Sequence, residues 1–462
     1  MKGEMKMLFQ RIEVPGLAHY SYIAGDGTEA VVIDPRRDCR IYDRIARSSR
    51  MSVRHILETH RNEDYVAGSR ELAELTGAEI WHADSELDYS YGSPVRDGQI
   101  WEAGSLKVQA IATPGHTPGS MSYLLHDQEG HPWICFTGDC LFAGDAGRVD
   151  LMGMDKAEEM AGMLYSSIFS RLLPLGDGVL VCPAHGPGSV CGSGITARTI
   201  TTMGLERKHN PRLQHDNRRA FIETMVEEQE RPPYFRKMEK LNLEGPPLLG
   251  GLSIPLALTP EDFRDRMEGS RVLDTRKEIC FASAHIPESL SIWNDGVAGF
   301  AGWYLPYDKP LLLVTEDDPE ATVRTLVRMG YDNIAGYLAG GMHSWHMAGL
   351  RSSSSSTLSV GEMCKILDGD NDPFILDVRS GDELSSDGRI PGALHIHATQ
   401  LPENYREIPD DRQVYIFCGS GNRSMVAASF LQQRGYGNIS VILGGLAGWN
   451  SSSCPLDLTV QG

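Results

Sequence analysis

Four residues that commonly bind metals lie on short loops, and each loop follows an apolar stretch of the chain. They are His60 in LETHRNEDY, His116 in ATPGHTPGS, Asp139 in CFTGDCLF and His185 in PAHGPG. Loops at the ends of strands are where proteins usually present catalytic and binding groups. One histidine in a turn is most often structural, but four such loops in succession favour a metal centre.

A fifth loop carries a candidate nucleophile. In VYIFCGSGNRSMVAASFLQQRG the pattern predicts a strand ending at Cys418, a turn GSGNR and a helix SMVAASFLQQR. Gly419 and Gly421 allow backbone N–H groups to converge on the sulfur, and the helix N-terminus adds positive partial charge. Both stabilise a thiolate, which is the nucleophilic form. Arg423 stands at C-x4-R spacing, which encloses a smaller volume than the C-x5-R loop of phosphatases and suits a sulfur carried on the cysteine.

The elements that must position the four metal-type loops are short strands and helices in alternation. Strands are expected over 9–14, 19–25, 29–35, 55–60 and 106–116, and helices over 69–77 and 156–173. Strands mixed with covering helices predict a layered α/β or α+β domain. The Pro- and Gly-rich stretch EGPPLLGG at 244–251 indicates a domain boundary.

Beyond that boundary the chain repeats itself. VLDTRKEIC resembles ILDVRSGDE, with Asp274 and Asp377 103 residues apart, and both copies end in a Gly-rich phrase before a tryptophan. This period indicates a tandem domain duplication. The stretch GLRSSSSSTLS at 349–359 predicts a flexible linker between the copies. The first copy places Thr315 where the second has Cys418, so it is expected to be inactive, with Cys280 in its core.

The four metal-type loops together resemble the metallo-β-lactamase fold, over residues 8–245. Its hydrolases bind two zinc ions with a THxHxDH motif, but here Asn62 and Tyr65 replace the second and third histidines. The remaining set, His60, His116 and Asp139, combines two imidazoles and one carboxylate, as in non-haem Fe(II) oxygenases. The persulfide dioxygenases of this fold use the three corresponding residues for one iron.

The same resemblance assigns roles to neighbouring residues. It implies that Arg148, in GRVD, lies near a thiol substrate, that Asp64 supports the site from outside the ligand set, and that His185 is a neighbour more than a ligand. Cys191, six residues after His185, is another near-site candidate, although a buried thiol is the simpler interpretation.

The loop around Cys418 is similar to the rhodanese active-site loop, and LDVR, RIPGA and LGGLAGW match other rhodanese phrases. The resemblance implies that Cys418 carries sulfane sulfur within the loop Gly419, Ser420, Gly421, Asn422, Arg423 and Ser424. The expected architecture is therefore an αββα metallo-β-lactamase sandwich at 1–245, an inactive α/β rhodanese-like domain at 253–350 and an active one at 357–462.

Composition limits the partners. A formal charge of −19 argues against nucleic-acid binding, and no apolar run approaches the length of a membrane span. The N-terminal residues have no apolar core of signal-peptide length, and the odd number of cysteines shows no CxxC pair, so we expect a cytoplasmic protein. Because the fold family often dimerises, a homodimer or higher homo-oligomer is left open.

The leading hypothesis is an Fe(II) persulfide dioxygenase, with one iron per chain, fused to a rhodanese. It would oxidise a small-molecule persulfide with O2 to sulfite, and Cys418 would make or consume thiosulfate. Two alternatives stand beside it. One is a zinc thioester hydrolase similar to glyoxalase II with an appended rhodanese, and the other is a sulfur-carrier scaffold whose metal domain is inert.

Overall fold

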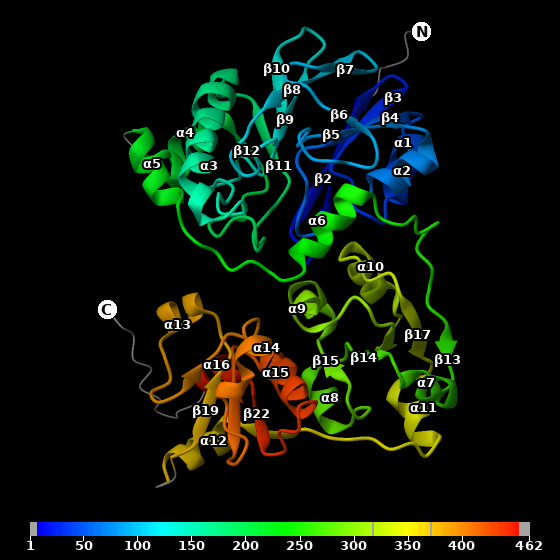
Figure 1. Cartoon of the computed structure of the whole chain (residues 1–462), viewed down its shortest axis with the longest axis vertical. Coiled ribbons are helices and arrows are strands. Elements are labelled where there is room, and N and C mark those ends of the chain that lie inside the picture. The colour runs from blue at the N-terminus through cyan, green and yellow to red at the C-terminus, as the bar shows by residue number, and fades with distance from the viewer. Residues whose placement is uncertain (1–6, 216, 317, 370–371, 452–462) are drawn as a thin grey trace. The chain divides into compact units, whose positions relative to one another are not determined.

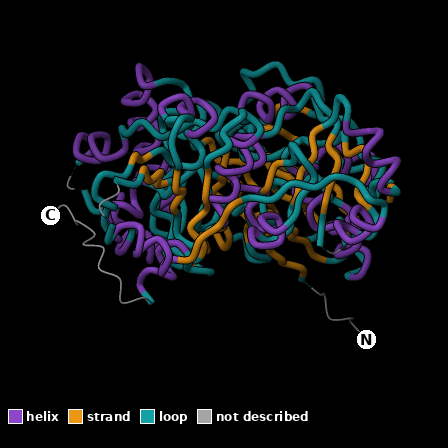
Figure 2. Tube along the Cα trace, turned by 90° about the horizontal axis from the view of Figure 1, so that it is seen from below, coloured by secondary structure: helices purple, strands orange, loops and turns teal. Residues whose placement is uncertain are grey.

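The computed structural model describes residues 7–215, 217–316, 318–369 and 372–451 (Figure 1). One compact unit extends to Ser253 and includes Val327–Gly330, and the second begins at Ile254. Figure 2 shows the same chain with its helices, strands and loops in different colours. No helix among the described residues is long and apolar enough to cross a membrane.

The first unit is built around two six-stranded sheets. The order in one sheet is β1-β2-β3-β4-β5-β6, and in the other it is β12-β11-β10-β9-β8-β7. The strands of the first sheet are β1 Leu8–Val14, β2 His19–Asp26, β3 Glu29–Ile33, β4 Ser52–Glu58, β5 Glu79–His82 and β6 Ser93–Pro94. Those of the second are β7 Ile100–Ala103, β8 Leu106–Ala112, β9 Met121–His126, β10 Pro132–Gly138, β11 Leu180–Pro183 and β12 Thr201–Thr202.

Helices cover the outer faces of both sheets. Helices α1 (Arg40–Ser48) and α2 (Ser69–Thr76) lie on one side, and α3 (Met154–Ser166), α4 (Met203–His209) and α5 (Arg218–Met225) lie on the opposite side (Figure 1). A π-helical turn at Ser167–Leu172 continues α3, and α6 spans Phe235–Glu244. This is the expected αββα sandwich.

Strand β3 shows how the sequence produces these layers. Its side chains alternate between the two faces, as the pleat of a strand requires. Val31 and Ile33 belong to the core between the sheets, whereas Ala30 and Val32 pack in the outer core with Tyr42 of α1. The run EAVVI is apolar on both faces because both faces are covered.

The second unit contains two five-stranded parallel sheets with the same strand order. The first sheet has the order β13-β17-β16-β14-β15 and the second has β18-β22-β21-β19-β20, so each strand of one copy has a counterpart in the other. The strands are β13 Ala257–Leu258, β14 Arg271–Asp274, β15 Leu290–Ser291, β16 Leu311–Val314, β17 Ile334–Leu338, β18 Ser356–Ser359, β19 Phe374–Asp377, β20 Leu394–His395, β21 Val414–Phe417 and β22 Ile439–Leu443.

The helices of this unit also fall into two sets, one for each sheet. In the first copy they are α7 Pro260–Met267, α8 Glu278–Ser283, α9 Val297–Tyr304, α10 Glu320–Arg328 and α11 Gly341–Met347. In the second they are α12 Val360–Leu367, α13 Gly381–Asp387, α14 Leu401–Asn404, α15 Asn422–Gln432 and α16 Gly445–Asn450.

The duplication extends to individual hydrogen bonds. After β14, the Arg276 guanidinium donates to both carboxylate oxygens of Asp274, and after β19 Arg379 does the same to Asp377. Both aspartates are buried, so the paired guanidinium offsets the cost of burying the charge. The LDTR and LDVR phrases therefore stabilise the end of one strand in each copy.

Three local expectations are corrected by the structure. Part of the serine-rich stretch is not a linker, because Ser356–Ser359 forms β18, pairs with β22 and leads into α12 through a capping box on Ser359. Helix α15 begins at Asn422, earlier than expected, because Gly421 at φ 117° ends the turn. Cys280 is not a core residue: its half-buried thiol donates to Glu316 Oε1 at 3.2 Å.

Candidate metal centre and sulfur-transfer site

The loops at the ends of four strands bring the metal-type residues together in the first unit. His60 follows β4, His116 follows β8, Asp139 follows β10 and His185 follows β11. All four are buried. Asp139 Oδ2 lies 3.7 Å from His60 Nε2 and 3.5 Å from His116 Nε2, and one ligand atom from each of these three residues lies within 4.8 Å of the others.

Hydrogen bonds fix which nitrogen of each histidine faces the centre. Thr59 Oγ1 contacts Asp34 Oδ2 at 2.8 Å and His60 Nδ1 at 2.9 Å. Because a carboxylate only accepts, the single hydroxyl proton goes to Asp34, and His60 Nδ1 must donate to Thr59. His116 Nδ1 likewise donates to the Arg148 carbonyl at 3.0 Å. Both Nε2 atoms are thereby directed to the centre as lone-pair donors.

The donor atoms at this centre fit a metal ion. His60 Nε2 and His116 Nε2 are buried and have no hydrogen-bond partner among the described residues. Burial alone would raise the pKa of Asp139, but His185, His60 and His116 outweigh it and lower the pKa well below its usual value. Two imidazoles and an ionised carboxylate around unsatisfied atoms form a ligand set suited to a divalent ion.

His185 connects the expected ligand Asp139 to Asp64. Its Nδ1 lies 2.8 Å from Asp139 Oδ1, and its Nε2 lies 2.9 Å from Asp64 Oδ2. Burial would lower the pKa of His185, but the two carboxylates raise it well above its usual value. Both ring nitrogens of His185 thus contact carboxylates in this structure.

Asn62 and Tyr65 stand where the motif has its second and third histidines, and neither supplies an imidazole nitrogen to the centre. Asn62 Nδ2 donates to the His60 carbonyl at 3.4 Å. The Tyr65 ring stacks on the His19 ring, with centroids 3.8 Å apart, and is buried. At the motif position of the third histidine, Tyr65 therefore makes an aromatic contact and offers no imidazole nitrogen to a metal.

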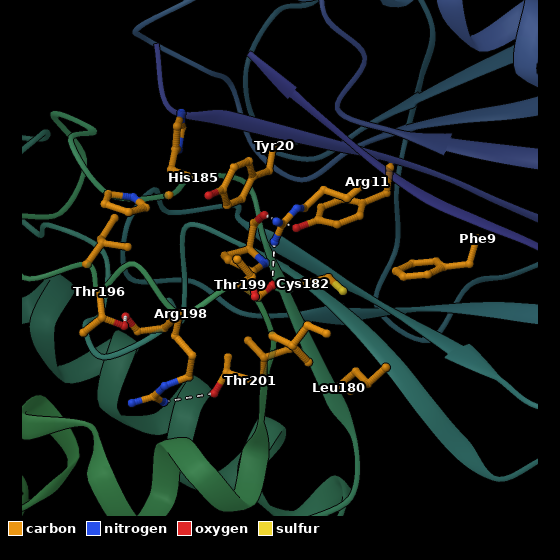
Figure 3. Close-up of a pocket in the computed structure, with 18 residues that line it drawn as sticks. Phe9, Arg11, Tyr20, Leu180, Cys182, His185, Thr196, Arg198, Thr199 and Thr201 are labelled. Carbon is orange, nitrogen blue, oxygen red and sulfur yellow. Dashed lines mark hydrogen bonds between the residues drawn. The ribbon is translucent and has the colours of Figure 1, made fainter. Parts of the chain in front are cut away.

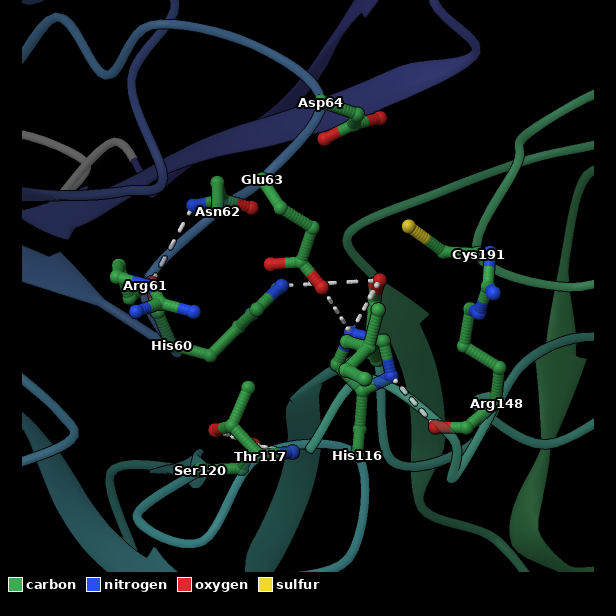
Figure 4. A network of polar contacts seen from close by, with 12 residues as sticks. His60, Arg61, Asn62, Glu63, Asp64, His116, Thr117, Ser120, Arg148 and Cys191 are labelled. Carbon is green, nitrogen blue, oxygen red and sulfur yellow. Dashed lines mark hydrogen bonds and ion pairs between the residues drawn. The ribbon is translucent and has the colours of Figure 1, made fainter. Parts of the chain in front are cut away.

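Glu63 is a site residue that the motif did not reveal. It occupies a variable position of the THxHxDH pattern, yet its carboxylate is fully buried and its Oε1 lies 3.2 Å from His116 Nε2 (Figure 4). Cys191 is also buried here, and its sulfur can reach a common point with Glu63 and His116. Burial raises the pKa of the Cys191 thiol well above its usual value, and Asp64 adds to the effect, so the thiol form is favoured.

Arg148 lies beside the centre but its guanidinium is used within the protein. It is buried, forms a two-bond pair with Asp150, and donates to the carbonyls of Val190, Gln229 and Glu230. These five bonds account for all five N–H donors. Contact with a substrate would require one of them to break, whereas the Arg148 carbonyl already orients His116.

The second unit presents Cys418 directly after β21. Its sulfur is buried and accepts a hydrogen bond from the Gly421 N–H at 3.1 Å. The start of α16 fixes this loop, because the N–H groups of Gly444, Leu446 and Ala447 donate to the carbonyls of Ser420, Cys418 and Gly419. A side chain at Gly445 would lie 2.1 Å from the Cys418 oxygen, so the LGGLAGW phrase keeps the loop in place.

The other residues of the Cys418 loop either begin helix α15 or form an ion pair. Asn422 opens α15, and Ser424 Oγ is buried without a partner among the described residues. Arg423 forms a two-bond pair with Glu383 at 2.5 and 2.6 Å. Hydrogen bonding from Arg423 lowers the pKa of Glu383 to about 2, so the carboxylate stays ionised.

The first copy has no thiol at the equivalent point. Asp274 pairs with Val314 as Asp377 pairs with Phe417, so the next residues, Thr315 and Cys418, are equivalent in register. A threonine has no sulfur and cannot form a persulfide, so the inactivity of the first copy stays a prediction.

A cavity of about 310 Å³ is lined by His185, the residue that contacts Asp139, and by none of the three proposed ligands (Figure 3). Its lining includes aromatic residues of β1 and β2 and the side chains of Arg11 and Arg198. Its volume is at the lower end of the range for small-molecule sites.

Comparison with known proteins accounts for this architecture. Residues 14–185 match the metallo-beta-lactamase superfamily, and residues 259–348 and 359–452 each match the rhodanese-like domain. A solved metallo-beta-lactamase structure from Staphylococcus aureus is 30% identical, covers 72% of this chain and 98% of that chain, and has a TM-score of 0.64. The chain belongs to the metallo-beta-lactamase superfamily. Its metallo-beta-lactamase domain is followed by two rhodanese-like domains.

Relatives of the metallo-beta-lactamase domain include two kinds of enzyme. The mitochondrial persulfide dioxygenase ETHE1 of Bos taurus is 27% identical over 259 residues, which are 52% of this chain and 84% of the relative. The hydroxyacylglutathione hydrolase GloC of Haemophilus influenzae is 29% identical over 215 residues, which are 42% of this chain and 91% of the relative. Identity alone does not separate the two activities, so the ligand set must.

Proposed function

We propose that this chain is an iron-dependent persulfide dioxygenase fused to a sulfurtransferase. The observation that carries the proposal is the convergence of His60 Nε2, His116 Nε2 and Asp139 on one point, while Asn62 and Tyr65 remove two ligands of a two-metal site. Fe(II) bound to such a set supplies open positions for a sulfur anion and O2. The reaction RSS⁻ + O2 + H2O gives RSH + SO3²⁻ + H⁺, and it needs no external reductant.

The chain's own residues would prepare this centre in three ways. Thr59 and the Arg148 carbonyl hold the two imidazoles with Nε2 inward. Burial of all the proposed ligands excludes bulk water, which strengthens electrostatic contacts. The cavity beside His185 offers room for the organic part of a thiol.

The rhodanese site would handle the second sulfur species. The Cys418 thiolate attacks the outer sulfur of thiosulfate, the S–S bond breaks, sulfite leaves with the bonding pair, and a Cys418 persulfide remains. A thiolate acceptor then takes that sulfur, and the same steps run backwards make thiosulfate from sulfite. The Gly421 N–H stabilises negative charge on the sulfur in either direction.

A thioester hydrolase is the second candidate, because GloC is a similar relative and because Asp64, Asp139 and His185 are all retained. Such a hydrolase requires two metals and a bridging water. In this structure both ring nitrogens of His185 contact carboxylates, so a second metal would have to displace these contacts.

Anaerobic metal analysis combined with O2 uptake separates the candidates. We expect about one iron per chain, O2 uptake with a low-molecular-weight persulfide, and no hydrolysis of S-lactoylglutathione. Two zinc ions with thioester hydrolysis and no O2 uptake would overturn the proposal in favour of the hydrolase.

Two variants test whether the metal domain is inert and only Cys418 works. His116→Ala should abolish O2 uptake but keep sulfur transfer from thiosulfate, and Cys418→Ser should do the reverse. His131→Ala, at an exposed loop histidine, and Cys280→Ser are the matched controls. Uptake that survives in His116→Ala, or disappears in Cys418→Ser, would contradict this division of labour.

A further inference from the structure

We propose that Arg61 and Arg231 bind a carboxylate on the organic part of the substrate, so that the centre selects persulfides of carboxylate-bearing thiols. This inference rests on the proposed function, because it concerns the substrate of the same metal centre. The two arginines would determine specificity, and neither belongs to the proposed ligand set.

The shortage of other free cations at the centre is the first argument. Arg148, which the motif places near a thiol substrate, already uses all five N–H donors within the protein. A charged group on the substrate would therefore need donors from another residue. Arg61 directly follows the proposed ligand His60 in the chain. In Figure 4 Arg61 lies on the His60 side of the centre, whereas Arg148 lies on the His116 side.

Arg61 has N–H donors that no protein group accepts from. Its Nη2 donates to Glu239 Oε1 at 3.0 Å. Its Nε is buried and has no hydrogen-bond partner among the described residues. A buried donor without an acceptor is unfavourable, and a bound anion would supply the missing acceptor.

The charges around Glu239 are unequal. Its Oε1 accepts from Nη2 of both Arg61 and Arg231, at 3.0 and 2.5 Å. Arg231 Nη1 donates to the uncharged carbonyl of Leu151 at 3.3 Å. We call Arg61, Glu239 and Arg231 the arginine cluster. Two guanidinium groups share one carboxylate, so one positive charge stays uncompensated, and the planar donors of arginine suit a carboxylate ligand.

The arginine cluster is both accessible and connected to the metal centre. The side chains of Arg61 and Arg231 are 16% and 42% exposed, so a ligand can reach them from solvent. The carbonyls of the two residues before Arg231 accept from the Arg148 guanidinium, and the Arg148 carbonyl orients His116. The cluster is thus tied to the segments that carry the two proposed imidazole ligands, His60 and His116.

The cavity lined by His185 gives room but no uncompensated charge. Its two arginines each pair with one glutamate, Arg11 with Glu13 and Arg198 with Glu206. An apolar skeleton would suit this cavity, whereas a carboxylate is matched better by the arginine cluster.

Thiol binding to the cobalt-loaded protein tests the inference without persulfide or O2. Co²⁺ is added anaerobically to metal-free full-length protein, and thiols are titrated while the thiolate-to-Co²⁺ charge-transfer band is recorded. Two pairs are compared, mercaptosuccinate with thioglycerol and glutathione with its diethyl ester. In each pair only the first thiol carries carboxylates. The ratio of the two dissociation constants therefore separates the effect of the carboxylate from that of the sulfur.

Two variants should act in opposite directions. Arg61→Gln removes a charged donor and should lower the preference for the carboxylated thiol by about 10-fold or more. Glu239→Gln removes the competing carboxylate and should raise this preference several-fold. Arg207→Gln is the matched control, because Arg207 on α4 also pairs with one carboxylate, that of Asp177, and donates to one carbonyl. This control should bind every thiol as the parent does.

Each outcome decides the question. Opposite shifts in Arg61→Gln and Glu239→Gln, with Arg207→Gln unchanged, would support the inference. A parent protein without this preference, or a preference that survives in Arg61→Gln, would overturn it. Equal weakening of both thiols of a pair in Arg61→Gln would also overturn it, because Arg61 would then only support His60. A protein that selects carboxylated thiols but consumes no O2 with their persulfides would keep this inference and refute the proposed dioxygenase activity.

Discussion

Replacing Thr59 by valine removes the hydroxyl that links Asp34 to His60 while almost preserving the side-chain shape. Thr59 is buried, and its hydroxyl makes contacts of 2.8 Å to Asp34 Oδ2 and 2.9 Å to His60 Nδ1. In the valine variant His60 Nδ1 has no acceptor. The imidazole is then free to move its proton to Nε2, the atom that must bind the metal.

The magnitude follows from these two contacts. Leaving a buried partner unsatisfied costs about 1–3 kcal/mol. Asp34 keeps its bond from the Thr59 backbone N–H, so the main loss falls on His60, and we expect metal-free protein to lose about 2 kcal/mol of unfolding free energy. Loss of the group that orients a ligating histidine should weaken metal binding by about 10- to 100-fold.

The assay is anaerobic Co²⁺ titration together with urea unfolding of the metal-free protein. Thr322→Val serves as the control, because Thr322 is also buried and donates to Asn294 Oδ1 at 2.8 Å, but lies in the first rhodanese-like domain. It should lose similar stability and no metal affinity. If Thr59→Val bound Co²⁺ as tightly as the parent, the Thr59 hydroxyl would not be what keeps the proton on His60 Nδ1 and leaves Nε2 free for the metal.

Three further outcomes concern the second rhodanese-like domain. Cys418→Ser should end sulfur transfer from thiosulfate while the iron content stays at the parent level; residual transfer would identify another carrier thiol. Glu383→Gln removes the negative charge that pairs with Arg423, which leaves the guanidinium available to bind an anion. The KM for thiosulfate should therefore fall several-fold, with a smaller change in kcat. A higher KM would contradict this, because it would mean that thiosulfate binding requires the Arg423–Glu383 ion pair. Burial, aided by the charge of Arg423, lowers the pKa of His397 from 6.5 to about 4. The unfolded chain therefore binds more protons between these values, and stability should fall by up to about 3 kcal/mol as pH drops from 6.5 to 4. His397→Asn should flatten this part of the urea-unfolding profile, and an unchanged slope would contradict the shift.

The repeated and periodic parts of this sequence predict structure well. The duplication at 103 residues predicts two equivalent sheets, and the shared register places Thr315 opposite Cys418. Both the equivalent sheets and the shared register follow from the repeated hydrophobic pattern of the strands, which can be read directly from the sequence. The serine-rich stretch misleads for the same reason: composition suggests a linker, but pairing of β18 with β22 supplies backbone hydrogen bonds that composition does not show.

Side-chain roles are harder to predict because they depend on which donors and acceptors meet in space. The sequence predicts Cys280 in a core, yet its half-buried thiol donates to Glu316, which is 36 residues further along the chain. Arg148 matches a motif position near the substrate, yet carbonyls from segments 42 to 82 residues away take three of its N–H donors. No local pattern in the sequence encodes such distant partners.

The segment THRNEDY combines both situations. Its motif positions predict the loss of a two-metal site, because Asn62 and Tyr65 are read directly from the sequence. Its variable position does not predict Glu63 as a site residue, because a glutamate after a strand is usually exposed. Burial of that carboxylate against His116 is visible only in three dimensions.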